Sequence, residues 1–201
     1  MIVIIDYGMG NLRSVEKAFA FLGHQVAVSD DPQLIKRAKG IVLPGVGAFG
    51  DAMQELAQRG LKELVIEALQ DGKPFLGICL GYQLLFENSQ ESPGVKGLGV
   101  LKGQVIRFPE SVKVPHMGWN DVKFAKRHPV LDGLAEGTFY YFVHSYYVHP
   151  SDEQIVLTRT EYGLEFASGI AQENILAFQF HPEKSSSAGL RLLHNFAQIC
   201  A

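Results

Sequence analysis

The chain has 201 residues, of which 47% are hydrophobic and 19% charged, and its formal net charge is −3. This composition can bury a sizeable core, which excludes intrinsic disorder. Charge is spread evenly, without a basic half, which argues against nucleic acid as a partner. Two cysteines are too few for a disulfide framework. No apolar run approaches the ~20 residues of a bilayer span, and the first residues lack the basic start of a signal peptide. We therefore expect a cytoplasmic globular protein with no membrane partner and a single domain, residues 1–201.

Short apolar runs alternate with helical patterns in the first part of the chain. Continuous apolar runs are typical of strands that are buried on both faces. The strands expected here are residues 2–5, 26–28, 41–43 and 75–78. The helices expected between them are residues 12–22, capped by Asn11 and ended by Gly23, residues 51–70 with a break at Gly60, and residues 80–87. Strands that alternate with helices predict a parallel sheet with helices on both faces.

The second part of the chain has few helical patterns between its strand-like segments. Turn signals such as Asp132-Gly133 and Glu136-Gly137 separate these segments. The strands expected are residues 100–108, 122–124, 139–143, 155–160 and 176–180, and an amphipathic helix is expected at residues 186–199. The fold class that follows is α/β, with a parallel or mixed central sheet flanked by helices and an additional antiparallel section.

The pentapeptide Gly77-Ile-Cys79-Leu-Gly81 is the most informative motif. It follows an expected buried strand and opens an expected helix, which is the setting of a nucleophile elbow with Cys in the place of Ser. Such a turn holds its middle residue in a strained conformation, and the flanking glycines leave room for the crossing backbone. A helix N-terminus behind the sulfur favours a thiolate and offers N–H groups to an oxyanion. The alternative is a buried structural cysteine, which is what we expect of Cys200.

His181 is the strongest candidate for the base that a cysteine nucleophile needs. It follows the expected strand at residues 176–180, and Pro182 biases it toward an extended backbone. Residues two apart in an extended chain face the same side, so Glu183 can accept the imidazole N–H and fix its orientation. The alternative is a structural histidine, and no second His or Cys at ligand spacing supports a metal site. With Cys79, the pair predicts a Cys-His-Glu triad.

The segment Gly45-Val-Gly-Ala-Phe-Gly50 matches the G-x-G-x-x-G pattern of dinucleotide-binding loops. It follows an internal strand and is preceded by Pro44, and both features argue against a nucleotide site. The same glycines equally allow a backbone N–H to reach the cysteine, or form only a tight strand-to-helix turn.

Aromatic residues are concentrated in residues 140–147, where alternation in a half-buried strand explains most of them. Trp119 lies in residues 115–120, which have a turn-like sequence. It is either an exposed contact residue, since tryptophan is enriched at interfaces, or a partly buried loop residue.

The segments Gly77-Ile-Cys-Leu-Gly-Tyr-Gln83 and Phe180-His-Pro-Glu183 together resemble the triad motifs of the class I glutamine amidotransferases. Further segments narrow the resemblance to the glutaminase subunits of imidazole glycerol phosphate synthases, which belong to histidine biosynthesis. These segments are Asp6-Tyr-Gly-Met-Gly-Asn-Leu-Arg-Ser14, Leu43-Pro-Gly-Val-Gly-Ala-Phe49, Pro115-His-Met-Gly-Trp-Asn120 and Val143-His-Ser-Tyr-Tyr147. The resemblance runs from residue 6 to residue 186 and covers essentially the whole chain.

The resemblance implies an enzyme that hydrolyses L-glutamine to glutamate and ammonia through a thioester on Cys79. His181 protonates the departing ammonia and then activates water, while Glu183 orients His181. No cofactor is implied. The residues implied to form the oxyanion hole are Leu80, Val46 and Gly47, and those implied to bind glutamine are Gly45, Gln83, Ser145 and Tyr146.

The implied partner is a (β/α)₈-barrel cyclase that forms a heterodimer with the glutaminase. Ammonia passes through the barrel interior, and the cyclase makes imidazole glycerol phosphate and an aminoimidazole carboxamide ribonucleotide. In the family, the oxyanion loop is properly aimed only when the loaded partner is present. Asn11, Trp119 and Lys184 are the residues expected to face this partner. Tyr82 departs from the methionine common in the family and is expected beside the glutamine pocket.

Two other hypotheses remain open at this point. A glutaminase that serves another synthase would share the triad, but it would not explain the Asp6–Ser14 segment. A nucleotide-binding module that uses the Gly45–Gly50 loop would need no cysteine chemistry. It would keep its full function after Cys79→Ala.

Overall fold

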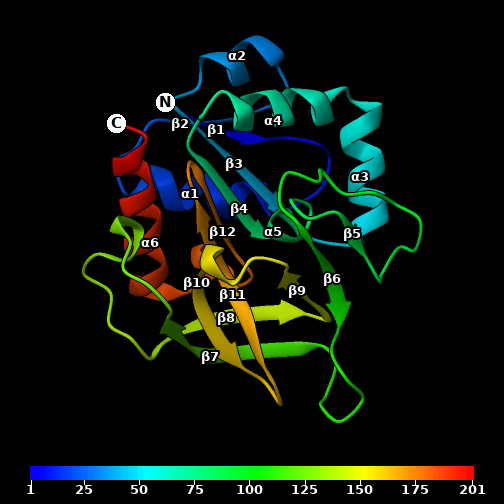
Figure 1. The fold of residues 1–201 in the computed structure, drawn as a ribbon. Helices are drawn as coiled ribbons and strands as arrows, with labels where there is room; N and C mark the ends of the chain where they lie inside the picture. Colours follow the sequence, from blue (N-terminus) through cyan, green and yellow to red (C-terminus); the bar gives the residue numbers. More distant parts are fainter.

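The computed structural model describes residues 1–201 and contains a mixed twelve-stranded sheet with helices on both faces (Figure 1). One half of the sheet is parallel. Its strands are, in spatial order, β2 (Val26–Ser29), β1 (Ile2–Ile5), β3 (Gly40–Gly45), β4 (Phe75–Cys79) and β12 (Ile175–Phe178). Four of these strands are fully buried, and β2 at the edge of the sheet is half-buried, so the predicted α/β fold with a parallel core is confirmed.

The other half of the sheet is antiparallel. Beyond β12 the order continues with β11 (Glu165–Gln172), β10 (Val156–Glu161), β7 (His116–Phe124) and β8 (Thr138–His144). The strands off this path are β5 (Asn88–Ser89), β6 (Gly103–Arg107) and β9 (Tyr146–Pro150). Apart from the parallel pair β5–β6, this is the predicted antiparallel section, and it is larger than the sequence indicated.

The helices divide between the two faces of the parallel strands, as alternation in β1 shows. Val3 and Ile5 pack in one apolar cluster with α2, α3 and α4, whereas Ile2 and Ile4 pack in another with α1 and α6. The helices are α1 (Leu12–Phe21), α2 (Pro32–Arg37), α3 (Phe49–Gln58), α4 (Leu61–Gln70), α5 (Leu80–Gln83) and α6 (Ser186–Ile199), with 3₁₀ turns η1 (Pro129–Leu131), η2 (Glu153–Ile155) and η3 (Pro182–Lys184). None of them has the length and hydrophobicity that crossing a bilayer requires.

Some elements were not predicted from the sequence. α2 has only 6 residues, which is too short for a helical repeat to show. β11 is buried at six consecutive positions, so it lacks the alternation that marks a half-buried strand. β5 and β9 are short and were also missed.

Two expectations about local structure were wrong. Residues 115–120 are not a turn, because residues 116–120 begin β7, a strand of 9 residues. Its apolar side chains Met117 and Trp119 are exposed, so the pattern of a strand packed on the core is absent. The helix expected at residues 80–87 ends at Gln83. The break at Gly60 is confirmed, whereas Asn11 occupies the N-cap of α1 without a side-chain capping hydrogen bond.

Gly81 allows α5 to lie directly against β3. A Cβ added at Gly81 would lie 1.8 Å from the carbonyl oxygen of Leu43. That oxygen belongs to the backbone of a central strand, which cannot move without disturbing both of its neighbours.

Gly81→Ala should therefore destabilise the fold by about 3 kcal/mol, since the core would be overpacked against a fixed backbone. Gly60→Ala is the matched control, because Gly60 has φ +67 but no atom within 4 Å of the added Cβ. It should cost only the backbone strain, about 1 kcal/mol. Urea unfolding measures both variants, and equal losses would contradict the steric argument.

Candidate active site

Cys79 lies at a strained turn between β4 and α5. Its backbone has φ 56 and ψ −108, a conformation that a residue other than glycine adopts only under constraint. The flanking glycines are needed at this turn, because a Cβ at Gly77 would lie 2.9 Å from the carbonyl oxygen of Gly81. The sulfur thus projects from the carboxyl edge of the sheet, above the N-terminus of α5. This is the turn geometry that a nucleophile elbow requires.

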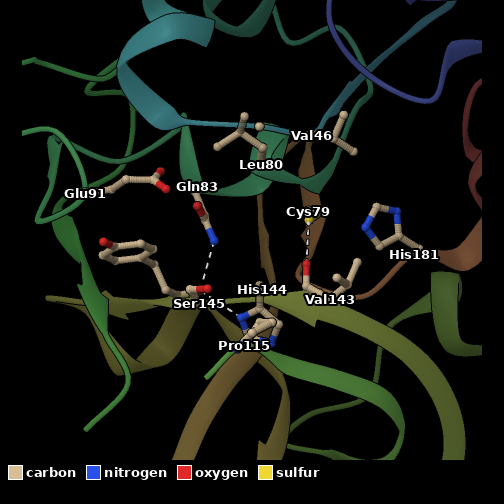
Figure 2. A pocket seen from close by; sticks show the side chains of 12 residues that line it. Val46, Cys79, Leu80, Gln83, Glu91, Pro115, Val143, His144, Ser145 and His181 are labelled. Atoms are coloured by element: carbon tan, nitrogen blue, oxygen red, sulfur yellow. Dashed lines mark hydrogen bonds between the residues drawn. The ribbon is translucent and has the colours of Figure 1, made fainter. Parts of the chain in front are cut away.

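His181 reaches Cys79 because β12 is parallel to β4 and adjacent to it. The register places Phe178 opposite Ile78, so the chain that leaves β12 passes close to Cys79. The His181 ring is 2% exposed, and its Nε2 has no hydrogen-bond partner although it is buried. Figure 2 shows the ring beside Cys79 at the edge of the cavity. An orphaned, buried nitrogen in this position is free to exchange a proton with the nucleophile or with substrate.

Glu183 holds the other ring nitrogen of His181. Its Oε1 lies 2.8 Å from His181 Nδ1, and its side chain is 1% exposed. The backbone is fixed as well, because the His181 N–H donates to the Tyr141 carbonyl at 2.9 Å and the Ser185 hydroxyl donates to the His181 carbonyl at 2.6 Å. The structure therefore brings together the three residues expected to form the triad.

The charge state of His181 follows from its neighbours. Burial by itself lowers the pKa of His181, but the adjacent Cys79 and the Glu183 carboxylate outweigh it and raise the pKa to about 10. At neutral pH the resting site therefore holds an imidazolium next to the sulfur, as in other cysteine–histidine pairs.

The loop expected to complete the oxyanion hole lies beside Cys79. β3 pairs with β4 so that Gly45 is opposite Cys79, and Val46 and Gly47 follow at once. A Cβ at Gly45 would lie 2.7 Å from the Tyr7 hydroxyl, so a side chain would push this loop out of place. Gly47 has φ +97, and Val46 is 40% exposed. The loop carries two peptides that glycine leaves free to reorient.

The N-terminus of α3 anchors the far end of this loop. Glu91 Oε2 accepts the Phe49 N–H at 2.8 Å, and the Ser92 hydroxyl accepts the Gly50 N–H at 3.0 Å. These N–H groups would have to hold the phosphates if the Gly45–Gly50 pattern bound a dinucleotide. They are already occupied, and a carboxylate stands where a phosphate would sit, which argues against the nucleotide-binding hypothesis.

A cavity of about 430 Å³ opens above Cys79 and His181 (Figure 2). Most of the residues expected to contact glutamine or the oxyanion line it, and Glu91, Pro115, Val143 and His144 were not anticipated. The lining residues are Val46, Gly47, Cys79, Leu80, Gln83, Glu91, Pro115, Val143, His144, Ser145, Tyr146 and His181. Glu91 supplies the one carboxylate among these lining residues, and no motif surrounds it in the sequence that could have identified it.

Some expected site residues lie outside this cavity. Gly45 is buried beneath the loop and shapes it without lining the cavity. Tyr82 does not lie beside the pocket, which corrects the expectation. Its ring is fully buried, packs against Phe86 and donates its hydroxyl proton to the Ala167 carbonyl at 3.2 Å. The structure thus gives the unusual tyrosine a core position.

The residues expected to face a partner lie outside the cavity too. Trp119 is 52% exposed on β7, beside Tyr141 of β8. The Lys184 ammonium lies 5.8 Å from the centre of the Tyr141 ring, which is the geometry of a cation–π contact. Met117 and Phe139, at 62% and 56% exposed, extend this apolar face. Asn11, at the start of α1, is partly exposed.

The raised pKa of His181 gives a direct test of the pairing. Cys79→Ala should lower the pKa of His181, because burial then opposes the Glu183 carboxylate alone. A folded-state pKa of about 10 contributes stability that is fully present below the unfolded value of ~6.5 and is lost as the pH rises toward 10. In Cys79→Ala the free energy of unfolding should therefore fall less steeply as the pH rises. NMR titration of the imidazole measures the shift, with Cys200→Ala as control, and an unchanged titration would remove Cys79 as its cause.

The comparisons with known proteins agree with this geometry. A family model described as "Glutamine amidotransferase class-I" matches residues 3–200. Proteins named "Imidazole glycerol phosphate synthase subunit HisH" are similar along their length. One from Aquifex aeolicus is 56% identical over 96% of this chain and 94% of its own length, and one from Methanothermobacter thermautotrophicus is 54% identical over 99% and 98%.

Solved structures with lower identity share the fold. A structure described as a glutamine amidotransferase has a TM-score of 0.79 at 21% identity, covering 100% of this chain and 99% of its own. PurLQS from Thermotoga maritima has a TM-score of 0.77 at 19% identity, covering 100% and 98%. The chain therefore belongs to the class-I glutamine amidotransferase family, within the group of the HisH subunits.

Proposed function

We propose that this protein is the glutaminase subunit of an imidazole glycerol phosphate synthase and that it releases ammonia from L-glutamine at Cys79. The observation that carries the proposal is the placement of a strained cysteine and a buried histidine–glutamate pair at the base of one cavity. We also propose that residues 1–201 act as a single glutamine amidotransferase domain. The family match over residues 3–200 and the continuous sheet support this.

The first half of the reaction forms a thioester. The Cys79 sulfur attacks the carboxamide carbon of glutamine, and the carbonyl oxygen becomes an oxyanion. The Leu80 N–H, at the first turn of α5, and an N–H of the Val46–Gly47 loop stabilise that charge. The His181 imidazolium gives its proton to the amide nitrogen, the C–N bond breaks, and ammonia leaves.

The second half releases glutamate. His181, now neutral, takes a proton from water while the water oxygen attacks the thioester carbon. The C–S bond breaks, glutamate departs, and the sulfur and imidazolium return to their resting state. Glu183 keeps Nδ1 protonated throughout, so that Nε2 remains the nitrogen that exchanges the proton.

The residues around the cavity suit the amino-acid end of glutamine. The Glu91 carboxylate offers a negative charge to the α-ammonium group, and Ser145 and Tyr146 lie across the cavity with hydroxyl and backbone groups for the α-carboxylate. Gln83 lies between them, and Gly45 keeps the floor of the loop free of side chains.

The partner that we propose is a (β/α)₈-barrel cyclase, which receives the ammonia. The word "subunit" in the relatives' names supports a complex. The apolar face formed by Met117, Trp119, Phe139 and Tyr141, with Lys184 over Tyr141, supports a docking surface near the cavity, because Val143 and Pro115 of the same region line it. We place Asn11 at the edge of this surface. We also propose that the loaded partner reorients the Val46–Gly47 peptides.

The decisive experiment is ammonia release from L-glutamine, with and without the cyclase and its ribonucleotide ligand. Cys79→Ala should reduce the rate by at least ~10³-fold, because the nucleophile is lost. Cys200→Ala, the other buried cysteine, should retain it. Release that rises steeply with the loaded cyclase would support the partner and the gating. No release from folded, reduced protein in any condition would contradict the proposal.

The docking surface has its own test. Trp119→Ala should weaken binding to the cyclase ~10- to 30-fold, since a large exposed aromatic at an interface is a typical hot spot. Phe21→Ala is the control, because Phe21 is 79% exposed at the end of α1 and lies outside the proposed surface. Titration calorimetry measures both affinities, and equal affinities would rule out Trp119 as an anchor.

A further inference from the structure

A continuous chain of hydrogen bonds connects the nucleophile to β7, and the reaction described above does not use most of it. The chain begins at the Cys79 sulfur, toward which Gln179 Nε2 points at 3.8 Å. Gln179 Oε1 accepts a hydrogen bond from Gln83 Nε2 at 3.0 Å. The same Gln83 nitrogen donates to the Tyr146 carbonyl, also at 3.0 Å. Gln179 itself is 0% exposed, so its side chain is shielded from bulk solvent.

Two buried histidines extend the chain beyond the Tyr146 carbonyl. His144 Nδ1 lies 2.8 Å from that oxygen, and His144 Nε2 lies 2.9 Å from His116 Nδ1. His116 Nε2 in turn lies 3.2 Å from Asn120 Nδ2, whose second hydrogen goes to the Glu161 carbonyl at 2.9 Å. Every polar atom of the two imidazole rings therefore has a partner.

The direction of every bond in this chain follows from one acceptor, the Tyr146 carbonyl. On one side Gln83 must turn its NH₂ group toward that oxygen, and the second N–H then faces Gln179. Gln179 must accept this hydrogen bond with its carbonyl oxygen, so its own NH₂ group faces the Cys79 sulfur. The sulfur thus meets a donor, which suits a nucleophile that carries negative charge when it attacks.

Beyond the Tyr146 carbonyl, the same acceptor determines the tautomers of His144 and His116. His144 must donate from Nδ1 to the Tyr146 carbonyl, so its Nε2 accepts from His116 Nδ1, and His116 Nε2 accepts from Asn120. Burial lowers the pKa of His116 to about 4 and that of His144 to about 3, so both rings are neutral at physiological pH and the tautomers persist. The His116 ring is also stacked on Tyr162, with ring centres 4.0 Å apart.

We propose that Gln179, His144 and His116 are positioning residues that hold the Cys79 sulfur and the Gln83 carboxamide in the geometry needed for glutamine binding and attack. The proposal rests on the assignment of this cavity to glutamine. The two ends of Gln179 have separable effects, because one end orders Gln83 and the substrate pocket and the other faces the sulfur. Loss of the first should raise KM, and loss of the second should lower kcat.

Two substitutions at Gln179 separate these effects. Gln179→Met keeps the length of the side chain but loses both contacts, so KM should rise and kcat should fall, each ~10-fold. Gln179→Glu keeps the acceptor for Gln83 and loses the donor to sulfur, so kcat should fall ~10-fold with KM changed by less than ~2-fold. Ser168→Ala is the matched control, since its hydroxyl is buried in the same sheet but bonds only to Thr158. Both parameters should stay unchanged.

The far end of the chain is tested by a rescue at His116. His116→Phe keeps the ring and its stacking but removes the donor to His144, so KM should rise ~3- to 10-fold. His116→Asn places an N–H near the position of Nδ1, and it should restore KM to within ~2-fold of the wild type. A purely structural role predicts the reverse order, because asparagine fills the cavity less well than phenylalanine.

The assays use the complex with the cyclase, and a second readout works without glutamine. Alkylation of Cys79 by iodoacetamide, in the Cys200→Ala background, reports the orientation of the sulfur and should change at least ~3-fold in Gln179→Glu. If the wild type releases no ammonia but alkylation changes, the proposed function fails, and only the effect of Gln179 on the Cys79 sulfur is supported, without its link to glutamine. If the wild type is active while kinetics and alkylation of the variants stay within ~2-fold, the positioning role is overturned. If the Gln179 variants do not fold, the KM values of the His116 variants decide. A higher KM in His116→Phe than in His116→Asn supports the positioning role, and the reverse order overturns it.

Discussion

The site depends on the parallel register of β3, β4 and β12. Gly45 lies opposite Cys79, and Phe178 lies opposite Ile78, so the three strands end together at one edge of the sheet. Parallel strands point their carboxyl ends in the same direction, and ligands bind there in open α/β sheets. The Val46–Gly47 loop, Cys79 and the histidine–glutamate pair each follow one of these strands at this edge. A slip of one residue would separate them.

The fold tolerates local strain and unsatisfied polar atoms at this edge. Cys79 has a positive φ, and the buried atoms His181 Nε2 and Glu183 Oε2 have no hydrogen-bond partner. A buried polar atom without a partner costs ~1–3 kcal/mol, so the rest of the structure offsets these terms. The apolar clusters on both faces of the sheet supply that stability. Of the residues that carry these costs, Cys79 and His181 line the cavity, and Glu183 lies behind His181 and holds its ring.

In the antiparallel section, strands β7 and β8 have a buried face and an outward face with different roles. Alternation along β8 buries Tyr140, Phe142 and His144, whereas Phe139 and Tyr141 face outward. The buried side holds the histidine chain that reaches Tyr146, and the outward side joins Trp119 in the exposed apolar face. The cavity and the proposed docking surface therefore share strand β8, since its Val143 and His144 line the cavity while its Phe139 and Tyr141 belong to the docking surface. A change in one of these faces would act on the other through a short path of covalent and hydrogen-bonded contacts.

The sequence by itself determined the parallel half of the fold and identified the three residues of the proposed triad, because both depend on local sequence patterns. An apolar run followed by Gly-x-Cys-x-Gly, and His-Pro-Glu after another strand, need only neighbouring residues to be recognised. The tertiary structure alone decided the contacts of Glu91 and Gln179, which meet their partners 42 and 96 residues away. It also placed Tyr82 in the core and turned residues 116–120 into a strand. Such contacts depend on how distant segments pack and pair in the sheet, and a local sequence pattern cannot predict that pairing.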